Sequence, residues 1–400
     1  MKHIHFSLLV IVIVSVFASC NSANKKIEIQ TKQTFNDSIT VIKSGIARFE
    51  LDSITSPHIQ ALQSYNNGDD SFLIYLNEET GALYINDIVT KKVIKSINVM
   101  DGAEHHNKTY QGFYYHNKDS IFMYSFKPKV TLINEMGEVK QEYILTSNSS
   151  DKNERQSYLG IWSSTTTPSS HLYSDTLYIN SVIVGGNRAN RKVQILLNVN
   201  TGQTRLSNTL FPEQYEKYNF GDINYDIYSN CVNSSKNMLV YSFPGYEKVI
   251  INQLNGNKVY EKSAQSKYIS YFTEYNKSDY SDAISSPTLE YFMTSPLYGG
   301  VYYDKFRDLY YRLALLPIEQ RNLNYEEKDS PLKQISVIVF DKDFNYLGEQ
   351  KLEPNKYLMF SAFVSEDGFN IQNRNNSDET FDFTTFIVKP KQDKKTLAKK

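Results

Sequence analysis

Residues 119–145 alternate short apolar runs with turn residues, and this pattern predicts a meander of β-strands. The apolar and aromatic runs lie at residues 121–126, 130–134 and 139–145, and Gly137 marks the turn before the last run. Runs of this length between turn residues are typical of antiparallel sheets. The apolar side chains of this unit that we expect to pack between neighbouring sheets are Ile121, Met123, Leu132 and Ile144.

Similar strand units recur along the chain, which is the pattern of a β-propeller. The predicted strands of blade one span residues 59–65, 71–76, 82–87 and 92–99, and blade two adds residues 110–116 to the three runs described above. Those of blade three span residues 158–162, 176–184, 192–198 and 203–209. Those of blade four span residues 225–230, 238–243, 248–252 and 257–262, and those of blade five span residues 299–304, 309–316, 334–341 and 346–352. Blade six has three predicted strands, at residues 357–364, 368–373 and 381–388.

The sixth unit lacks a fourth strand, and the run from Gly45 to Leu51 is left over near the N-terminus. We therefore predict that this N-terminal strand closes the ring, which would remove the exposed sheet edges. The fold prediction is an all-β chain forming a β-propeller of six blades, with seven as the alternative count. Two β-sandwich domains are disfavoured because no polar linker divides the chain, and a solenoid because the repeats are too long.

Four outer turns share the same residue types. An Asn or Asp opens each turn and a Gly follows, in Asn134–Gly137, Asn198–Gly202, Asn252–Gly256 and Asp341–Gly348. The amide or carboxylate bonds to the backbone two residues on, and glycine takes the position with positive φ. We expect one short helix, over residues 210–218, where Pro212 suits a first turn.

Composition supports an all-β fold and argues against a nucleic-acid partner. The 400 residues include 31 Tyr and one Trp, and tyrosine packs on a half-buried sheet while its hydroxyl stays hydrated. The formal net charge is -1, whereas a protein that binds nucleic acid needs a basic face to attract the phosphate backbone. Nucleic acid is therefore not an expected partner.

The N-terminus predicts export and lipid anchoring. Lys2 precedes an apolar stretch, residues 6–18, that is too short to span a bilayer as a mature helix. Small residues before Cys20 resemble the lipobox of bacterial lipoproteins, with Phe17 in place of its usual aliphatic residue. We predict a signal peptide over residues 1–19 and membrane attachment through lipidated Cys20. An ordinary secretory signal is the alternative.

The predicted domain organisation follows from these boundaries. A flexible polar tether that needs no secondary structure spans residues 20–44, and a single propeller domain spans residues 45–389. A Lys-rich tail spans residues 390–400; we interpret it as a disordered, solubilising end, and contact with anionic headgroups is the alternative. Acylation of Cys20 would leave Cys231 without an intrachain disulfide partner, so we interpret Cys231 as a small buried hydrophobic residue.

The most concentrated polar constellation lies on the predicted hairpin of blade five. Its members are Tyr302, Tyr303, Asp304, Arg307, Tyr310, Tyr311 and Arg312. One interpretation is structural, with tyrosines packed between blades and the charged groups fixing the hairpin. The other is a ligand-binding surface for sugars or a peptide carboxylate, formed by Tyr302, Asp304, Arg307 and Arg312. Trp162, beside a Ser/Thr loop, is a second ligand-binding candidate, and a packing role is the alternative.

Recognisable catalytic and metal motifs are lacking. The acidic run from Asp341 has Tyr346 and Leu352 where a calcium loop needs Gly and Glu, and the run from Asp222 fails at Ile227. The segment Glu104–His106 offers no further ligand at zinc spacing. We therefore predict no metal, no cofactor and no catalytic residue. A pair of catalytic carboxylates contributed by different blades would have no recognisable spacing in the sequence, so this prediction does not cover such a pair.

Several of these segments together resemble a known family. The lipobox, the strand DSIFMY, the Gly-containing outer turn, the hairpin YYDKFRDLYYR and the segment FVSEDGFNI are similar to uncharacterised Bacteroidota lipoproteins labelled domain of unknown function 4221. The resemblance implies a six- or seven-bladed propeller and no assigned reaction. In that phylum an acidic run after the lipidated Cys marks surface export, and residues 21–26 lack it.

These observations favour a lipoprotein anchored to the outer membrane, facing the periplasm, with surface display as the alternative. Its expected function is to bind or scaffold a protein, peptide or glycan, and the alternative is a propeller glycan hydrolase or lyase.

Overall fold

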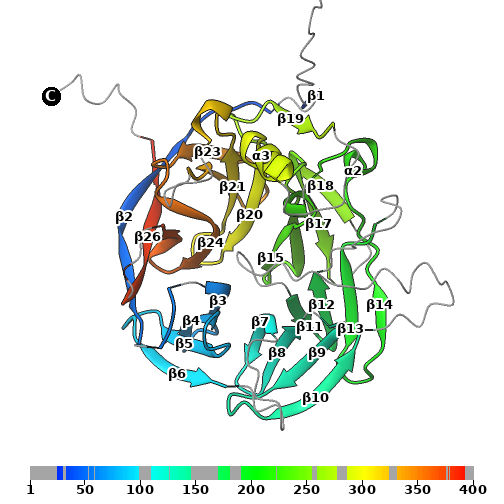
Figure 1. The fold of residues 1–400 in the computed structure, drawn as a ribbon, viewed down its shortest axis with the longest axis vertical. Helices are drawn as coiled ribbons and strands as arrows, with labels where there is room; N and C mark the ends of the chain where they lie inside the picture. The colour runs from blue at the N-terminus through cyan, green and yellow to red at the C-terminus, as the bar shows by residue number, and fades with distance from the viewer. Residues whose placement is uncertain are drawn as a thin grey trace, which may run out of the picture.

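The computed structural model describes residues 25–29, 33–98, 110–145, 170–180, 191–254, 259–276, 286–323 and 331–391, apart from positions 53, 58, 126, 222, 375, 376 and 378. Over this part of the chain, six four-stranded antiparallel sheets form a ring around a central axis (Figure 1). The fold is therefore a six-bladed β-propeller. This confirms the all-β prediction and decides against the alternative count of seven.

The first five blades are consecutive meanders in which the first strand lies nearest the axis (Figure 1). Blade one has β3 (Ile59–Asn66), β4 (Ser71–Asn77), β5 (Leu83–Asp87) and β6 (Val93–Ile97). Blade two has β7 (Tyr110–Asn117), β8 (Ser120–Ser125), β9 (Lys129–Ile133) and β10 (Val139–Ile144). Blade three has β11 (Ser170–Tyr173), β12 (Thr176–Asn180), β13 (Gln194–Asn198) and β14 (Thr204–Leu206).

Blades four and five follow the same plan. Blade four has β15 (Ser229–Asn233), β16 (Met238–Ser242), β17 (Lys248–Gln253) and β18 (Val259–Ser263). Blade five has β20 (Leu297–Asp304), β21 (Leu309–Leu316), β22 (Gln334–Asp341) and β23 (Tyr346–Lys351). The predicted strands of these blades match within a few residues, except that β15 begins at Ser229 and not at Tyr225.

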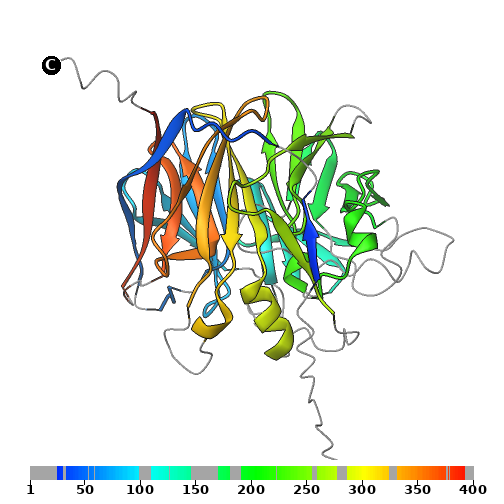
Figure 2. The same ribbon diagram turned by 90° about the horizontal axis from the view of Figure 1, so that it is seen from above.

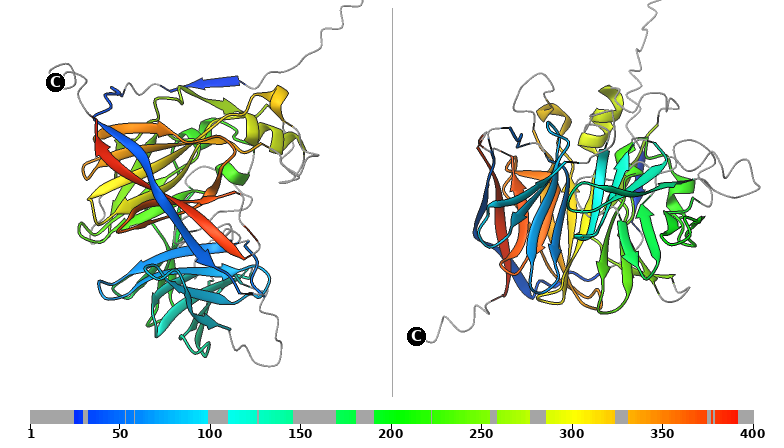
Figure 3. Two further views of the ribbon diagram at one scale, coloured as in Figure 1. Left: turned by 90° about the vertical axis from the view of Figure 1, so that its left-hand side faces the viewer. Right: turned by 90° about the horizontal axis from the view of Figure 1, so that it is seen from below.

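Blade six joins the two ends of the chain. It contains β24 (Tyr357–Ser365), β25 (Gly368–Asn373) and β26 (Thr380–Pro390), and its outermost strand is β2 (Ile39–Glu50). β2 pairs antiparallel with β26 from Ile39 opposite Pro390 to Glu50 opposite Thr380 (Figure 3). The predicted closure by an N-terminal strand is confirmed, and the strand begins at Ile39 and not at Gly45.

Blade three differs from the prediction in its innermost strand. The predicted strand at residues 158–162 lies outside the described residues. The inner position is taken by β11, which pairs with β12 from Ser170 opposite Ile179 to Tyr173 opposite Thr176. Its sequence, SHLY, is too short and too polar to stand out as an apolar run.

Two outer turns form as their residue types predict. The side-chain oxygen of Asn134 accepts hydrogen bonds from two backbone N–H groups of its turn, and Gly137 has φ 79°. Asn198 does the same in blade three, where Gly202 has φ 72°. Glycine suits both positions because a Cβ disfavours positive φ.

The turn after Asp341 is closed in another way. The carboxylate of Asp341 accepts from the backbone of Asp343 and Asn345, and Phe344 adopts φ 64°. The predicted role of Gly348 is wrong, because this residue lies within β23. A Cβ at Gly348 would lie 2.8 Å from the Ile39 side chain of β2, so the glycine allows blade five and the closing strand to approach.

The N-terminal segment is structured where we predicted a free tether. Strand β1 (Lys25–Glu28) pairs antiparallel with β19 (Tyr271–Glu274) beyond blade four. Residues 33–38, which we call the strap, then lead to β2. The prediction that residues 20–44 lack secondary structure is therefore wrong for β1 and for the start of β2.

The strap is fixed to blades four and five by polar contacts. The side-chain oxygen of Gln33 accepts from Ser263 Oγ at 2.7 Å and from a backbone N–H of blade four. The carboxylate of Asp37 accepts from Lys267 Nζ at 2.8 Å and from Tyr346 Oη at 2.6 Å. Burial alone would raise the pKa of Asp37, but these two hydrogen bonds outweigh it and lower the pKa.

Helices are short and lie outside the blades. Helix α2 (Gln214–Lys217) confirms only the centre of the helix predicted over residues 210–218, and α3 (Ser286–Thr294) was not predicted. Single 3₁₀ turns form at Ile223–Tyr225 and Gln320–Asn322. Among the residues that the structure describes, no helix is long and apolar enough to cross a membrane.

The hydrophobic core lies between neighbouring blades. Ile121 and Met123 of β8 are fully buried, as predicted, against the apolar strands of blade one. Ile144 is an exception, because it is 56% exposed while its neighbours Tyr143 and Leu145 are buried. Alternation along β10 therefore directs the aromatic side chain inward, and the core prediction is wrong for Ile144.

Candidate functional site

A cavity of about 410 Å³ lies on the propeller axis, where the inner strands of all six blades meet. We call it the channel pocket. Its described lining comes from Leu62–Asn66, Tyr114–His116, Ser170–His171, Asn230–Val232 with Ser234, Val301–Tyr303 with Lys305, and Ala362–Val364. Five blades contribute the later part of their first strand, and blade three contributes the start of β11. The pocket therefore opens at the face where the first strands of the other five blades end.

Polar contacts between inner strands hold this lining in place. The buried amide of Gln63 donates to the carbonyl of Tyr115 and accepts from its N–H, both at 2.8 Å. The side chain thus pairs with β7 as a strand would, and it joins blades one and two. On the opposite side, Ser229 Oγ accepts from the N–H of Val301 at 3.0 Å and joins blades four and five.

Tyrosine rings form much of the wall. The rings of Tyr65 and Tyr115 meet edge to face with centroids 4.9 Å apart. Tyr115 Oη donates to the carboxylate of Glu135 at 2.6 Å, which in turn pairs with Lys95 at 2.9 Å. Tyr115 is therefore fixed from behind, and its contact with Tyr65 makes this part of the wall rigid and aromatic.

Two histidines lie beside the same wall. His116 Nδ1 is 3.4 Å from Tyr114 Oη, and the ring of Tyr114 meets that of His171 with centroids 6.3 Å apart. Burial lowers the pKa of His116, and burial together with repulsion from His116 lowers the pKa of His171 to about 4. Both imidazoles are therefore neutral at pH 7, and each offers one N–H donor and one acceptor.

One cation lies at the mouth. Lys305 Nζ reaches from blade five to blade one, where it donates to the carbonyl of Asn66 at 3.0 Å and to its side-chain oxygen. Partial burial lowers the pKa of Lys305. Within the described lining there is no Asp or Glu, so the pocket presents a positive charge, neutral imidazoles and tyrosine faces.

The predicted ligand-binding residues of blade five do not converge on this pocket. Tyr302 lines it, but Asp304 is fully buried at the end of β20. The carboxylate of Asp304 accepts from two backbone N–H groups, from Tyr311 Oη and from Arg307 Nη1 at 3.0 Å. Arg307 also donates to the backbone of blade six. These contacts match the structural interpretation of the hairpin.

Arg312 lies between blades four and five and is fully buried. Its five N–H groups donate to Ser242 Oγ and to four backbone carbonyls of blade four, and its guanidinium lies 3.7 Å from the ring centre of Tyr298. No N–H group of Arg312 remains for a ligand. Trp162 and Cys20 lie outside the described residues.

Apart from Tyr302, the residues that line the pocket were not predicted as ligand-binding residues from the sequence. His116, His171 and Lys305 belong to no motif and lie far apart in the sequence. The available signal was the position of these residues within the blades, because the first strand of every blade lies nearest the axis (Figure 1). Cys231 lines the pocket as well, and burial raises the pKa of its thiol, as suits an unreactive side chain.

The described residues contain no group of three or more His, Cys, Asp or Glu side chains that could hold a metal ion. The segment Glu104–His106, which we considered for zinc, lies outside those residues.

The fold places the chain among six-bladed β-propellers with a polar, aromatic channel pocket. Residues 38–351 match the family described as domain of unknown function 4221, and the chain belongs to this family. The family has no assigned reaction, and its propeller fold is consistent with a binding or scaffold module.

Two solved structures support the fold. A member of the same family from Bacteroides vulgatus is 19% identical, with a TM-score of 0.73 over 89% of this chain and 99% of that one. A Bacteroides fragilis protein predicted to be exported is 11% identical, with a TM-score of 0.53 over 90% of this chain and 98% of that one. Among curated proteins, none matches the sequence.

Proposed function

We propose that this protein is a lipid-anchored module of the bacterial cell envelope that binds a glycan or peptide in the channel pocket. The observation that supports it is the pocket lining, where fixed tyrosine faces, neutral histidines and Lys305 surround a cavity of about 410 Å³. Ligand sites of this size combine apolar surface with a few oriented polar groups. Tyr302 is the one sequence candidate within the described residues that belongs to this site.

The orientation of the domain fits such a role. Lys25, at the start of β1, pairs with Glu274, which precedes α3. Helix α3 in turn precedes β20 and lies at the face where the inner strands begin (Figure 2). The channel pocket opens at the other face, so a chain anchored through Cys20 would direct the pocket away from its membrane. Outer-membrane attachment with a periplasm-facing domain, or surface display, is part of this proposal.

The experiment that tests the binding function measures affinity for glycan and peptide panels with the purified mature chain. Replacing Lys305 or Tyr65 by Ala removes the mouth cation or one aromatic wall, and we expect each variant to weaken binding about tenfold. Tyr268→Ala is the matched control, because Tyr268 is 39% exposed and lies outside the pocket. Binding that survives both pocket variants would contradict the proposal.

Lipid attachment has a separate test. Growth with a labelled fatty acid should label the wild-type chain and leave a Cys20→Ala variant unlabelled and released from the membrane fraction. A labelled Cys20→Ala chain would contradict lipidation at this residue.

A lyase is the second candidate, and one observation favours it over a hydrolase. The described lining offers His116 and His171 as neutral bases and Lys305 as a cation for an acidic sugar, whereas hydrolysis requires paired carboxylates. Incubation with uronic-acid polysaccharides should then yield unsaturated products that absorb ultraviolet light. A lack of such products with every uronic-acid polysaccharide tested would favour binding alone.

A further inference from the structure

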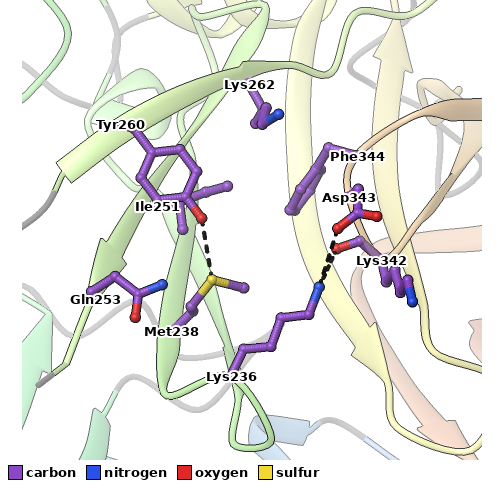
Figure 4. Close-up of a pocket in the computed structure, with 9 residues that line it drawn as sticks. All are labelled: Lys236, Met238, Ile251, Gln253, Tyr260, Lys262, Lys342, Asp343 and Phe344. Carbon is purple, nitrogen blue, oxygen red and sulfur yellow. Dashed lines mark hydrogen bonds and ion pairs between the residues drawn. The ribbon is translucent and has the colours of Figure 1, made fainter.

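A second cavity, of about 690 Å³, lies between blades four and five, away from the channel pocket (Figure 4). We call it the interblade groove. Strands β16, β17 and β18 form one side, and the turn that joins β22 to β23 forms the other. Nothing in the proposed channel function uses this groove.

The floor of the groove is apolar and fixed. Met238, Ile251 and Phe344 line it and are each buried to more than nine-tenths. Tyr260 Oη lies 3.3 Å from Met238 Sδ, and the ring of Phe344 stacks on that of Tyr310 with centroids 4.2 Å apart. The cavity is therefore held open by packed side chains, and its floor suits an apolar group of a ligand.

The rim of the groove is cationic. Lys236 Nζ donates to the carbonyl of Lys342 at 2.8 Å and pairs with the Asp343 carboxylate at 3.4 Å (Figure 4). Lys262, which extends from β18 toward the cavity, and Lys342 have no carboxylate within 4.0 Å in the part of the chain that the structure describes. Both side chains are exposed, so their ammonium groups leave a positive charge over an apolar floor.

We propose that the interblade groove binds an extended acidic segment of a partner protein, with one aromatic or aliphatic side chain on the floor and carboxylates at Lys262 and Lys342. A simple anion would leave the floor unused, and a neutral apolar ligand would leave the two lysines unused. The aliphatic parts of the floor, Met238 and Ile251, suit a buried side chain better than the flat face of a sugar. Electrostatic complementarity of this kind selects a partner and accelerates its association.

The experiment uses the full mature chain and fluorescent peptides whose binding is followed by anisotropy. A short peptide with a phenylalanine flanked by acidic residues should bind, and its affinity should fall with added salt. Changing the phenylalanine to serine, or the acidic residues to lysine, should each reduce the affinity about tenfold or more. The variant Lys262→Glu with Lys342→Glu should reduce the affinity of the acidic peptide by a similar factor.

Lys140→Glu is the matched control, because this lysine is exposed on β10 of blade two, away from the groove. Thermal unfolding of all variants checks that they fold. The proposal is overturned if Lys140→Glu weakens binding as much as the groove variant, or if the serine peptide binds as well as the phenylalanine peptide. It is also overturned if the chain forms a dimer that the groove variant dissociates, since a second copy would then occupy the groove.

Discussion

At the scale of single residues, a buried guanidinium joins two blades. Arg312 of β21 donates all five of its N–H groups to blade four and faces no carboxylate within hydrogen-bonding distance in the described structure. Burial lowers the pKa of Arg312 to about 10, so the side chain remains charged at pH 7. Two of the carbonyls that it binds, those of Tyr246 and Ala264, have no other donor in the described structure and would otherwise be buried without one.

We therefore expect Arg312→Met to destabilise the domain strongly. The substitution removes five hydrogen bonds and leaves the carbonyls of Tyr246 and Ala264 without a donor in the described structure, and losses of this kind cost about 3–5 kcal/mol of the free energy of unfolding. Urea unfolding followed by tyrosine fluorescence measures the change. Arg48→Met is the control, because Arg48 is exposed and pairs with Asp382 at the surface, and little change is expected there. Equal stability of the two variants would contradict an interblade role.

His171 makes a second residue-scale prediction, which concerns pH. Its pKa is about 4 in the folded chain, because of burial and the nearby His116, and about 6.5 when exposed. The unfolded chain therefore binds more protons between these values, and the stability contributed by neutral His171 is lost as pH falls from about 6.5 to about 4. The variant His171→Gln should lose less stability than wild type over this window in denaturant titrations at several pH values. Parallel curves would contradict the assignment.

At the scale of elements, the N-terminal strap connects three blades. It contacts blade four through Gln33, contacts Lys267 and Tyr346 through Asp37, and enters β2, which closes blade six. The backbone N–H of Ser38 also donates to Leu347 of blade five at 2.8 Å. The strap therefore extends the closure of the ring beyond the pairing of β2 with β26.

Deleting residues 25–38 tests this role. The pairing of β2 with β26 survives the deletion, so we expect the ring to fold with a lower melting temperature. Removing residues 25–50 also deletes β2, exposes the edge of β26 and should yield aggregated protein. Circular dichroism and size-exclusion chromatography distinguish the two outcomes. A melting temperature unchanged by the first deletion would show that the strap is not part of the folded ring.

The sequence pattern could predict the elements better than the site. Apolar alternation and the Asn and Gly turns predicted most strands, and a leftover run near Gly45 predicted the closure. The pattern did not predict β11, which is short and polar. It also assigned Ile144 to the core, whereas in β10 the neighbouring Tyr143 faces inward and Ile144 faces outward, which is a shift of one residue in the alternation.

The pocket was harder to predict for a physical reason. Each blade contributes only a few lining residues, and residues as distant as Asn66 and Lys305 meet only once the ring closes. Local periodicity carries no information on such long-range contacts. Conversely, the cluster from Tyr302 to Arg312 was conspicuous in sequence because hairpin neighbours are close along the chain, and its buried charges serve the packing of blade five.

At the scale of the whole molecule, the two faces of the ring have different surroundings if the proposed anchor is correct. Helix α3 and the start of β1 lie toward one face, and the mouth of the channel pocket lies at the other (Figure 2). A tether that leads from Lys25 to a lipidated Cys20 is only a few residues long. The face with α3 would therefore stay near the bilayer.

Site-directed labelling on membranes tests this orientation. In a Cys231→Ser background, a single cysteine replaces Ser234 at the pocket mouth or Leu289 on α3, and both positions are exposed. A bulky maleimide should label the Ser234 position equally fast in lipidated protein on vesicles and in unlipidated protein that carries Cys20→Ala. Labelling at the Leu289 position should slow on vesicles, because the bilayer hinders access to that face. Protection at the Ser234 position on vesicles would place the pocket against the membrane and contradict ligand entry from the aqueous side.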